Sequence, residues 1–416
     1  MPGIQSTTND SVSMALPTAG TLPQPHSMRR FADIALKTAA GFWFVVVLIG
    51  QLFFAFSIAS FYGLTAFRGN WHAWNKTMTH GYTPGFLVGN AVVAIHLASA
   101  VIIILGGAIQ LIPRIRQRAP AFHRWNGRIY MVFAFTVSLA GLYMLWFRGA
   151  VGGVSQHVAQ SLDAVLIMLC AAMALRYALA RDFSTHRRWA LRLYLVVSAS
   201  LFVRAASILL PFAPLKGPFG FDPVATQGPF LTELGYAQYL VPLAVLELYL
   251  RAQERPGAPR RIAMAAVLFV LTIALGAGIS AVIVGVFVPH IKTAFDSRKS
   301  IAEVLSATIA SSGIDTAAEQ YRRLKAAQPA TYNFDENELN GLGYELLRSR
   351  KFDEAIRIFQ LNVEAYPQSG NVYDSLAEAH MDDGKRSQAI ADYRESLQKN
   401  PKNRNAVQML QKLNAH

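Results

Sequence analysis

Residues 91–112 read AVVAIHLASAVIIILGGAIQLI, a run of 22 residues without a charged side chain. About 20 consecutive apolar residues in a helix span the hydrocarbon core of a bilayer, so this run predicts a transmembrane helix. Other runs along the chain have a similar length and composition. Together they predict seven spanning helices, at about 39–63, 91–112, 125–147, 152–179, 189–211, 229–250 and 262–288.

The composition of the 416-residue chain agrees with a membrane protein, since 53% of its residues are hydrophobic and 15% are charged. The one cysteine, Cys170, lies inside an apolar run, which excludes a disulfide framework and a cysteine-based zinc site. The sequence contains no phosphate-binding loop, dinucleotide fingerprint or hydrolase motif. Redox chemistry would therefore need a cofactor.

The formal net charge of +14 comes from the membrane half of the chain. Residues 1–291 hold 22 Lys/Arg and 8 Asp/Glu, whereas residues 292–416 hold 17 of each. This placement argues against nucleic-acid binding. When the connecting segments are assigned alternately to the two sides, 17 Lys/Arg lie on one side and 4 on the other. We expect a bacterial inner-membrane protein with its N-terminus in the cytoplasm and its C-terminal tail in the periplasm.

Three domains are predicted. Residues 1–37 are polar and aperiodic, as in a disordered cytoplasmic leader. A transmembrane domain follows at 38–290, and a helical domain occupies 298–416.

The helical domain has an internal period of 34 residues, which is the spacing of the tetratricopeptide repeat (TPR). Clear repeats are predicted at 336–369 and 370–403, with a cap at 404–416 and a degenerate first repeat at 300–331. The fold class is therefore all-α, a seven-helix transmembrane bundle followed by a TPR α-solenoid. Such repeats either form a stable helical module or bind a peptide or partner protein. Adding 34 to the positions of one set of residues gives the equivalent residues of the next repeat. The first set is Leu339, Leu342, Gly343, Ala355, Phe359 and Pro367, and the second is Tyr373, Leu376, Ala377, Ala389, Tyr393 and Pro401.

Four histidines lie in the second to fifth predicted helices, which form a four-helix core of two similar helix pairs. His96 and His157 each lie about five residues into a run, roughly 8 Å below the outer boundary, and form an outer pair. His123 and His186 form an inner pair near the cytoplasmic side. A b-type haem held by two histidines needs imidazoles from two helices at one level, so these four are candidate axial ligands.

Other uses of these histidines stay open. The inner pair could anchor helix ends, and the outer pair could form hydrogen bonds between helices. Asp163 and Arg204 fall in the outer half of the membrane. They could form an ion pair, or Arg204 could neutralise a haem propionate or a small anion, or Asp163 could relay protons. Candidate propionate or lipid-headgroup contacts on the inner side are Arg124 and Arg187, with Arg128, Arg188 and Arg192 beside them.

Short motifs between the second and fifth predicted helices carry a resemblance: Gln110-Leu111, Pro120, His123-Arg124-Trp125, Gly127-Arg128-Ile129-Tyr130 and His186-Arg187-Arg188-Trp189. Through them, residues from about 90 to 212 resemble a bacterial multi-pass family known as domain of unknown function 2306, which implies a membrane fold and no activity. The order of the histidines, in turn, resembles that of the dihaem cytochromes that pass electrons from ascorbate across membranes.

The first functional hypothesis is therefore transmembrane electron transfer by one or two b haems, with the TPR module positioning a periplasmic partner. In that case the chain would be a membrane oxidoreductase without catalytic side chains or a metal other than haem iron. The alternative is a non-catalytic, membrane-anchored scaffold that binds a periplasmic protein or peptide through its repeats. A third use is the handling of a lipid or small anion near Arg204. His72 and His80 are solvated loop residues, or they bind a metal or cover the outer pocket, although no third metal ligand is evident.

Overall fold

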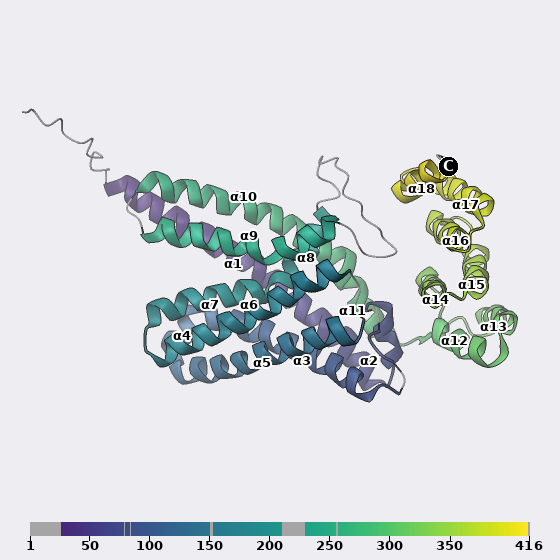
Figure 1. Cartoon of the computed structure of the whole chain (residues 1–416), viewed down its shortest axis with the longest axis horizontal. Coiled ribbons are helices and arrows are strands. Elements are labelled where there is room, and N and C mark those ends of the chain that lie inside the picture. The colour runs from purple at the N-terminus through teal and green to yellow at the C-terminus, as the bar shows by residue number, and fades with distance from the viewer. Residues whose placement is uncertain are drawn as a thin grey trace, which may run out of the picture. The chain divides into compact units, whose positions relative to one another are not determined.

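The computed structural model describes residues 26–78, 80–83, 85–149, 153–209, 229–254 and 257–414, and these are mainly helical (Figure 1). The chain divides into two compact units. The membrane unit consists of residues 1–57, 95–147 and 151–288, and the second unit consists of 58–94, 148–150 and 289–416.

Five helical stretches of the described residues are long and apolar enough to cross a membrane: Ser27–Phe67, Leu87–Leu111, Pro120–Phe147, Val154–Leu179 and Ala258–Phe295. A sixth arises if the bent pair α7 and α8 is counted as one span. The helices concerned are α1 (His26–Ile58), η1 (Ala59–Gly63), α2 (Leu64–Phe67), α3 (Leu87–Leu111), α5 (Pro120–Phe147), α6 (Val154–Leu179), α7 (Phe183–Val197), α8 (Ala199–Leu209), α10 (Ala258–Val282), η4 (Ile283–Phe287) and α11 (Val288–Phe295). Two short helices, η2 (Trp71–Lys76) and α4 (Pro113–Arg118), lie between them.

The sequence predicted seven spans, and the remaining one corresponds to α9 (Pro229–Glu254). This helix has 26 residues, enough to span a bilayer, but it is not among the helices with a sufficiently apolar 18-residue stretch. Its polarity comes from charged residues such as Glu247 and Arg251. The seventh span therefore stays a prediction.

The first helix begins at His26, well before the expected start near residue 39. Residues 26–37 were expected to belong to the disordered leader, and the remainder of that leader, 1–25, lies outside the described residues. The added turns carry Asp33, which forms an ion pair with Arg261 at the start of α10. Local polarity along the sequence does not predict a contact between two helices that are far apart in the chain.

The predicted helix 189–211 is bent, because α7 and α8 meet at an angle of 46° around Ser198. The Ser198 hydroxyl donates a hydrogen bond to the Tyr194 carbonyl at 2.7 Å. Serine hydroxyls that bond back to the preceding turn commonly bend helices.

The membrane unit packs around a core to which α3, α5, α6, α7 and α9 contribute, through Ile103, Tyr130, Ile167, Leu193 and Tyr239 respectively. A glycine of α3 makes room for an aromatic ring of α5. A Cβ atom at Gly107 would lie 2.9 Å from Cε2 of Tyr130, so the ring occupies the space that a side chain would fill.

The C-terminal part of the second unit is an array of helical hairpins (Figure 1). Two successive hairpins and the final single helix begin at residues 336, 370 and 404, which are 34 residues apart. A short parallel pairing joins β1 (Lys299–Ser300) to β2 (Tyr332–Asn333). The helices are α12 (Ile301–Ser312), α13 (Ile314–Ala327), α14 (Glu336–Arg348), α15 (Phe352–Ala365), α16 (Gly370–Asp382), α17 (Arg386–Lys399) and α18 (Arg404–Asn414).

The hairpins α14–α15 and α16–α17 each close through a small residue on the first helix and an aromatic ring on the second. Gly343 lies against Phe359, and a Cβ atom at position 343 would be 2.5 Å from the ring. The corresponding residues 34 positions later, Ala377 and Tyr393, are both fully buried. The period therefore records a repeated packing arrangement.

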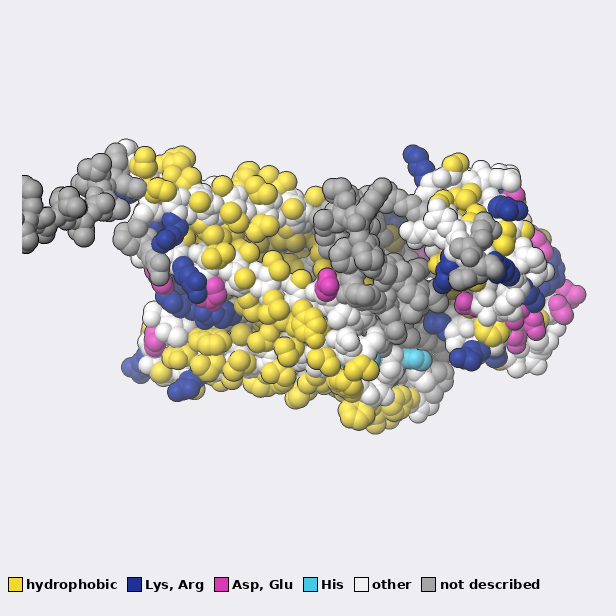
Figure 2. All heavy atoms as spheres, turned by 45° about the horizontal axis from the view of Figure 1, so that its top comes forward, with side chains coloured by type: hydrophobic (Ala, Val, Ile, Leu, Met, Phe, Trp, Pro, Cys, Tyr) yellow, Lys and Arg dark blue, Asp and Glu magenta, His cyan; other side chains and the backbone are white. Residues whose placement is uncertain are grey.

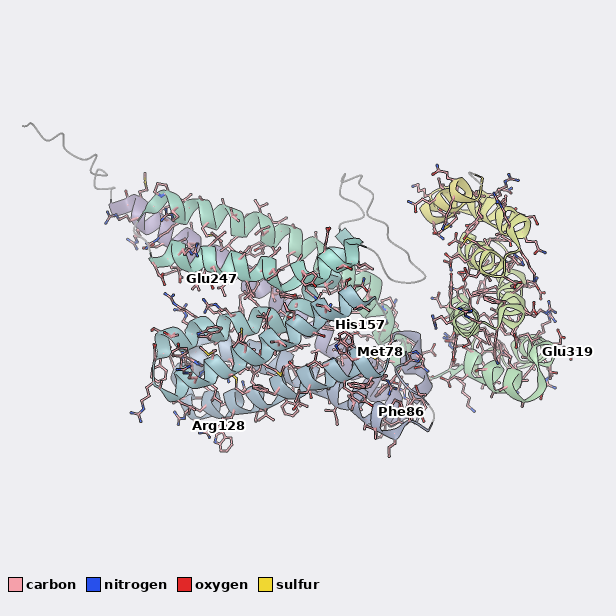
Figure 3. The ribbon with its side chains drawn as sticks, viewed as in Figure 1. Met78, Phe86, Arg128, His157, Glu247 and Glu319 are labelled. Carbon is pink, nitrogen blue, oxygen red and sulfur yellow. The ribbon has the colours of Figure 1, made fainter. Side chains whose placement is uncertain are left out.

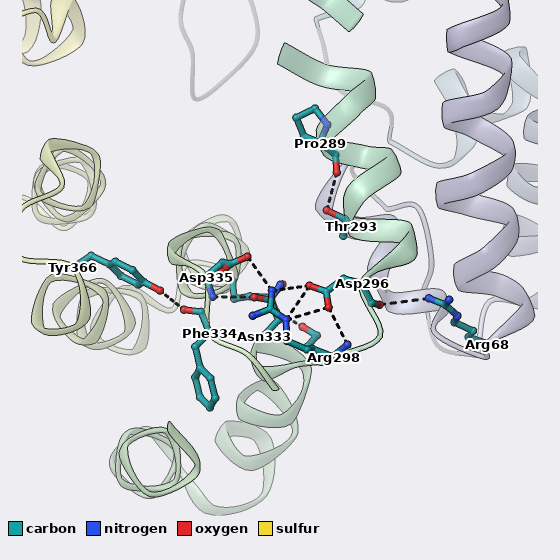
Figure 4. A network of polar contacts seen from close by, with 11 residues as sticks. Arg68, Pro289, Thr293, Asp296, Arg298, Asn333, Phe334, Asp335 and Tyr366 are labelled. Carbon is teal, nitrogen blue, oxygen red and sulfur yellow. Dashed lines mark hydrogen bonds and ion pairs between the residues drawn. The ribbon is translucent and has the colours of Figure 1, made fainter. Parts of the chain in front are cut away.

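A polar network joins the segment after α11 to the array (Figure 4). Arg298 donates to the Asp296 carboxylate at 2.8 Å and reaches Asp335 at 3.5 Å. Arg68, which follows α2, donates to the Ala294 carbonyl at 2.7 Å. These bonds hold the connecting segment at both of its ends.

We expect Gly343→Ala to destabilise the array by about 1–3 kcal/mol, because the fully buried Phe359 ring must move. Gly341→Ala on the same helix is the control, since no atom lies within 4 Å of its added Cβ and alanine favours helix. Hydrogen exchange of α14 and α15 in the full-length protein measures the difference. Equal protection in the two variants would contradict the packing argument.

Candidate functional site

His96 of the outer pair is bound to α5. Its Nδ1 lies 3.1 Å from the Val137 carbonyl, and since a carbonyl only accepts hydrogen bonds, Nδ1 carries a proton. In the neutral imidazole, Nε2 then has the lone pair. The ring lies over Gly141, where a Cβ would be 3.4 Å from Cε1.

His157, the other member of the outer pair, packs edge-on against Trp146 of α5, with ring centroids 5.6 Å apart (Figure 3). Trp146 also donates to the Ser161 hydroxyl at 3.0 Å. Val137 and Trp146 are nine residues apart, or about 14 Å along the helix. The two histidines thus contact α5 at different levels, and their role as a pair of haem ligands stays a prediction.

The two histidines of the inner pair interact electrostatically. His186 donates from Nδ1 to the Ala174 carbonyl at 2.8 Å. His123 lies within electrostatic range of His186, and its own Nδ1 is buried without a hydrogen-bond partner in the described structure. Gln110 donates to the His123 carbonyl at 2.9 Å, which ties α3 to the start of α5.

Basic side chains gather at one end of the apolar helices, with acidic ones among them (Figure 2). Arg192 donates to Glu247 of α9 at 2.6 Å, and Arg188 pairs with Glu254. These two arginines therefore join α7 to α9. Arg124 and Arg187 are exposed, and so is Arg128, which stacks over Trp125 at 5.0 Å (Figure 3). Their role toward propionates or lipid headgroups stays a prediction.

The ion pair considered for Asp163 and Arg204 is not formed. Arg204 donates instead to the Ser200 carbonyl at 2.5 Å and lies 4.7 Å over the Phe54 ring of α1. The Asp163 Oδ1 atom is buried and has no hydrogen-bond partner within the described residues. Binding of an anion or a propionate by Arg204 stays a prediction.

Arg148, one of the four basic residues assigned from the sequence to the outer side of the membrane, forms a buried polar cluster with the segment 80–90. It is 8% exposed and donates to the His80 carbonyl at 2.6 Å, the Gly81 carbonyl at 3.2 Å and the Asn90 side chain at 2.8 Å. Its guanidinium also lies 5.5 Å from the Phe86 ring (Figure 3). No sequence motif marks this arrangement, because the bonds go mainly to backbone carbonyls.

The structure describes the side chain of only one of the two loop histidines, and their use as metal ligands stays a prediction. His80 is exposed, and the side chain of His72 lies outside the described residues. Within the described part of the chain, no three His, Cys, Asp or Glu residues are grouped so that they could hold a metal ion.

A second polar cluster lies on the first helices of the array, and we call it the polar face: Tyr344, Asp374, Glu378 and Asn405. The Tyr344 hydroxyl donates to Glu378 at 2.6 Å. The Asn405 side-chain amide donates to Glu378 at 2.9 Å and to Asp374 at 3.0 Å. The polar face thus connects α14, α16 and α18.

Burial dominates the electrostatics of the polar face. It raises the pKa of Glu378, which Asp374 raises further, while hydrogen bonds from Tyr344 and Asn405 act in the opposite direction. Burial also raises the pKa of Asp374. Both carboxyls therefore hold their protons more tightly in the folded array than in an unfolded chain.

Comparison with known proteins finds that part of the chain is similar to one family. Residues 93–241 match the family described as "Predicted membrane protein (DUF2306)". The match extends from α3 into α9 and so includes all four candidate histidines. No curated protein and no solved structure matches the chain.

The raised pKa values predict how the array responds to pH. At pH values between the unfolded-state and folded-state pKa values of these carboxyls, the folded array binds more protons than the unfolded chain. The free energy of unfolding of the array therefore falls as the pH rises through this range. We expect greater hydrogen-exchange protection of α16 at about pH 5 than at about pH 7, after correction for intrinsic exchange. Glu378→Gln should reduce this difference, whereas Glu345→Gln at an exposed site should preserve it. An identical pH response in both variants would contradict the assignment.

Proposed function

We propose that the chain is a membrane-anchored binding protein whose helical array takes up a segment of a partner protein. The observation that carries this proposal is the polar face, on which three successive first helices share one hydrogen-bonded network. Solenoids commonly bind partners on extended surfaces built from repeated positions.

The array is proposed to be a TPR solenoid. Support comes from the 34-residue spacing of its helix starts and from the repeated pairing of small residues with aromatic rings. Its location outside the cytoplasm is also part of the proposal and rests on the distribution of Lys and Arg between the two sides of the membrane.

The hydrogen-bonding groups and charge of the polar face indicate which kind of partner segment would bind there. The Asn405 amide nitrogen is bound to two carboxylates, so its carbonyl oxygen remains as an acceptor. Asp374 is half-buried and adds a further acceptor and negative charge, whereas Glu378 is buried and bonded within the network. Asn337 and Asn371 are exposed at the corresponding positions of the two preceding hairpins. An extended segment with basic side chains supplies the donors and positive charge that complement this face.

Peptide binding by the full-length protein in lipid nanodiscs tests the proposal. We expect lysine-containing peptides to bind, and the same peptides with glutamine in place of lysine to bind more weakly. Asp374→Asn should weaken binding roughly tenfold, as expected for the loss of a charged hydrogen bond. Glu319→Gln removes an exposed carboxylate from α13 and is the matched control (Figure 3). Equal loss in both variants would indicate a general charge effect and contradict a site on the polar face.

A second candidate function is electron transfer through a b haem, and the inner histidine pair favours it. Histidines that bind metals usually donate their other ring N–H to a carbonyl or carboxylate, as His186 does to Ala174. His123 is near enough to His186 to interact electrostatically. A bound haem would supply one-electron transfer. His123 and His186 would hold the iron, and the exposed Arg124 and Arg187 would neutralise the propionates.

Visible absorption spectra of oxidised and reduced protein, purified from haem-supplied cells, test this second function. We expect the sharp bands of a low-spin six-coordinate haem, and their loss in His186→Ala. His80→Ala, in an exposed loop, should leave the spectrum unchanged. A colourless protein would end the cytochrome hypothesis, and partner binding by the array would be unaffected.

A further inference from the structure

Asp163 lies on the buried side of α6. Four buried residues of α6 lie at helical spacings from Asp163. They are Ala159 and Ile167, each four residues away, Cys170, seven residues away, and Ala174, eleven residues away. Residues at these spacings share one face of a helix. The carboxyl group therefore lies on the stripe that packs into the core of the membrane unit.

Close packing surrounds this position. The Tyr239 hydroxyl of α9 donates to the Ala159 carbonyl, one turn before Asp163, at 3.3 Å. A Cβ atom at Gly235 would lie 3.3 Å from that of Ala159, so α9 approaches α6 closely here. The carboxyl also lies within electrostatic range of Tyr239 and Cys170.

No basic side chain pairs with Asp163 among the residues that the structure describes. Arg192 of α7, which reaches Cys170 electrostatically, is paired with Glu247, and Arg204 is bound to Ser200 and Phe54. The remaining ionisable groups of the surrounding core are hydroxyls, Tyr130 of α5, Tyr194 of α7, and Tyr236 and Tyr239 of α9. The Asp163 Oδ1 atom is buried and has no hydrogen-bond partner among the described residues, so a carboxylate anion here lacks a countercharge and is incompletely solvated, whereas the neutral acid carries no charge to compensate.

We propose that Asp163 is a proton-binding site within the membrane unit, a carboxylic acid that is neutral at neutral pH and releases its proton reversibly. The ligand is a proton, which binds one carboxylate oxygen to form the O–H group and leaves it to hydroxide or water. This site is independent of partner binding by the array and of haem binding by the histidines. Ionisable residues inside membranes commonly mark the paths of protons and ions.

Infrared spectroscopy of the full-length protein in lipid tests the protonation state. We expect a carboxylic-acid C=O band at neutral pH that shifts in heavy water, disappears reversibly at alkaline pH and is missing from Asp163→Asn. Glu233→Gln removes an exposed carboxyl from α9 and should retain the band. A spectrum without this band, or with the band intact in Asp163→Asn, would overturn the proposal.

Chemical labelling gives a second measurement that needs no variant to fold. Dicyclohexylcarbodiimide adds to protonated carboxyl groups in apolar surroundings, so mass spectrometry of the wild-type protein should find the adduct on Asp163 at neutral pH and lose it as pH rises. The exposed Glu233 should stay unlabelled. Absence of the adduct from Asp163 would overturn the proposal. So would protection of Asp163 by Na⁺ at constant pH, because that result would assign the site to a metal cation.

Discussion

The structure of the membrane unit depends on one constraint, that the hydrocarbon core offers no hydrogen bonds to polar groups. Long helices satisfy this constraint for the backbone because they pair each N–H and C=O within one segment. Side chains must meet the same demand individually. His96 and His186 meet it by donating to carbonyls of neighbouring helices. Side-chain polarity inside the unit therefore also specifies which helices pack together.

The charges near one end of the bundle follow from the same constraint. Arg192 and Arg188 of α7 pair with acidic residues of α9, and Arg261 of α10 pairs with Asp33 of α1. These pairs are partly exposed to solvent, where an isolated ion pair contributes about 0–1 kcal/mol. Their main consequence is specificity, since each pair joins two particular helices. The same acidic residues make α9 more polar than the other long helices.

The sequence could predict those parts of the fold that depend on local patterns of residue type, namely the spanning helices and the repeat boundaries. The apolar runs at 91–112 and 152–179 correspond closely to α3 and α6, because length and composition alone decide whether a segment suits a membrane. The hairpin helices begin at the predicted repeat boundaries, because a 34-residue period is also a local signal. The bend at Ser198 and the early start at His26 depend on single contacts that carry no periodic signal.

The candidate sites were harder to predict because they depend on how each helix is rotated. Helix depth placed His96 and His157 at one level, yet their partners on α5 are nine residues apart. No sequence pattern predicts the contacts of Arg148, because it binds mainly backbone carbonyls, which every residue type provides.

The array shows how a repeat can preserve packing while its chemistry varies. Asn362 and Ser396 occupy equivalent positions, and each donates to the carbonyl of the first residue in its own hairpin, Glu336 at 3.1 Å and Gly370 at 2.8 Å. An amide and a hydroxyl thus make the same bond, which ties the second helix of each pair to the start of the first. The first helices are then free to differ in the groups that they present. In α14 the residue equivalent to Glu378 is Tyr344, and these two side chains bond to each other across adjacent hairpins. A repeat that placed carboxyls at both positions would bring like charges together, so the alternation of hydroxyl and carboxyl is what allows the polar face to form.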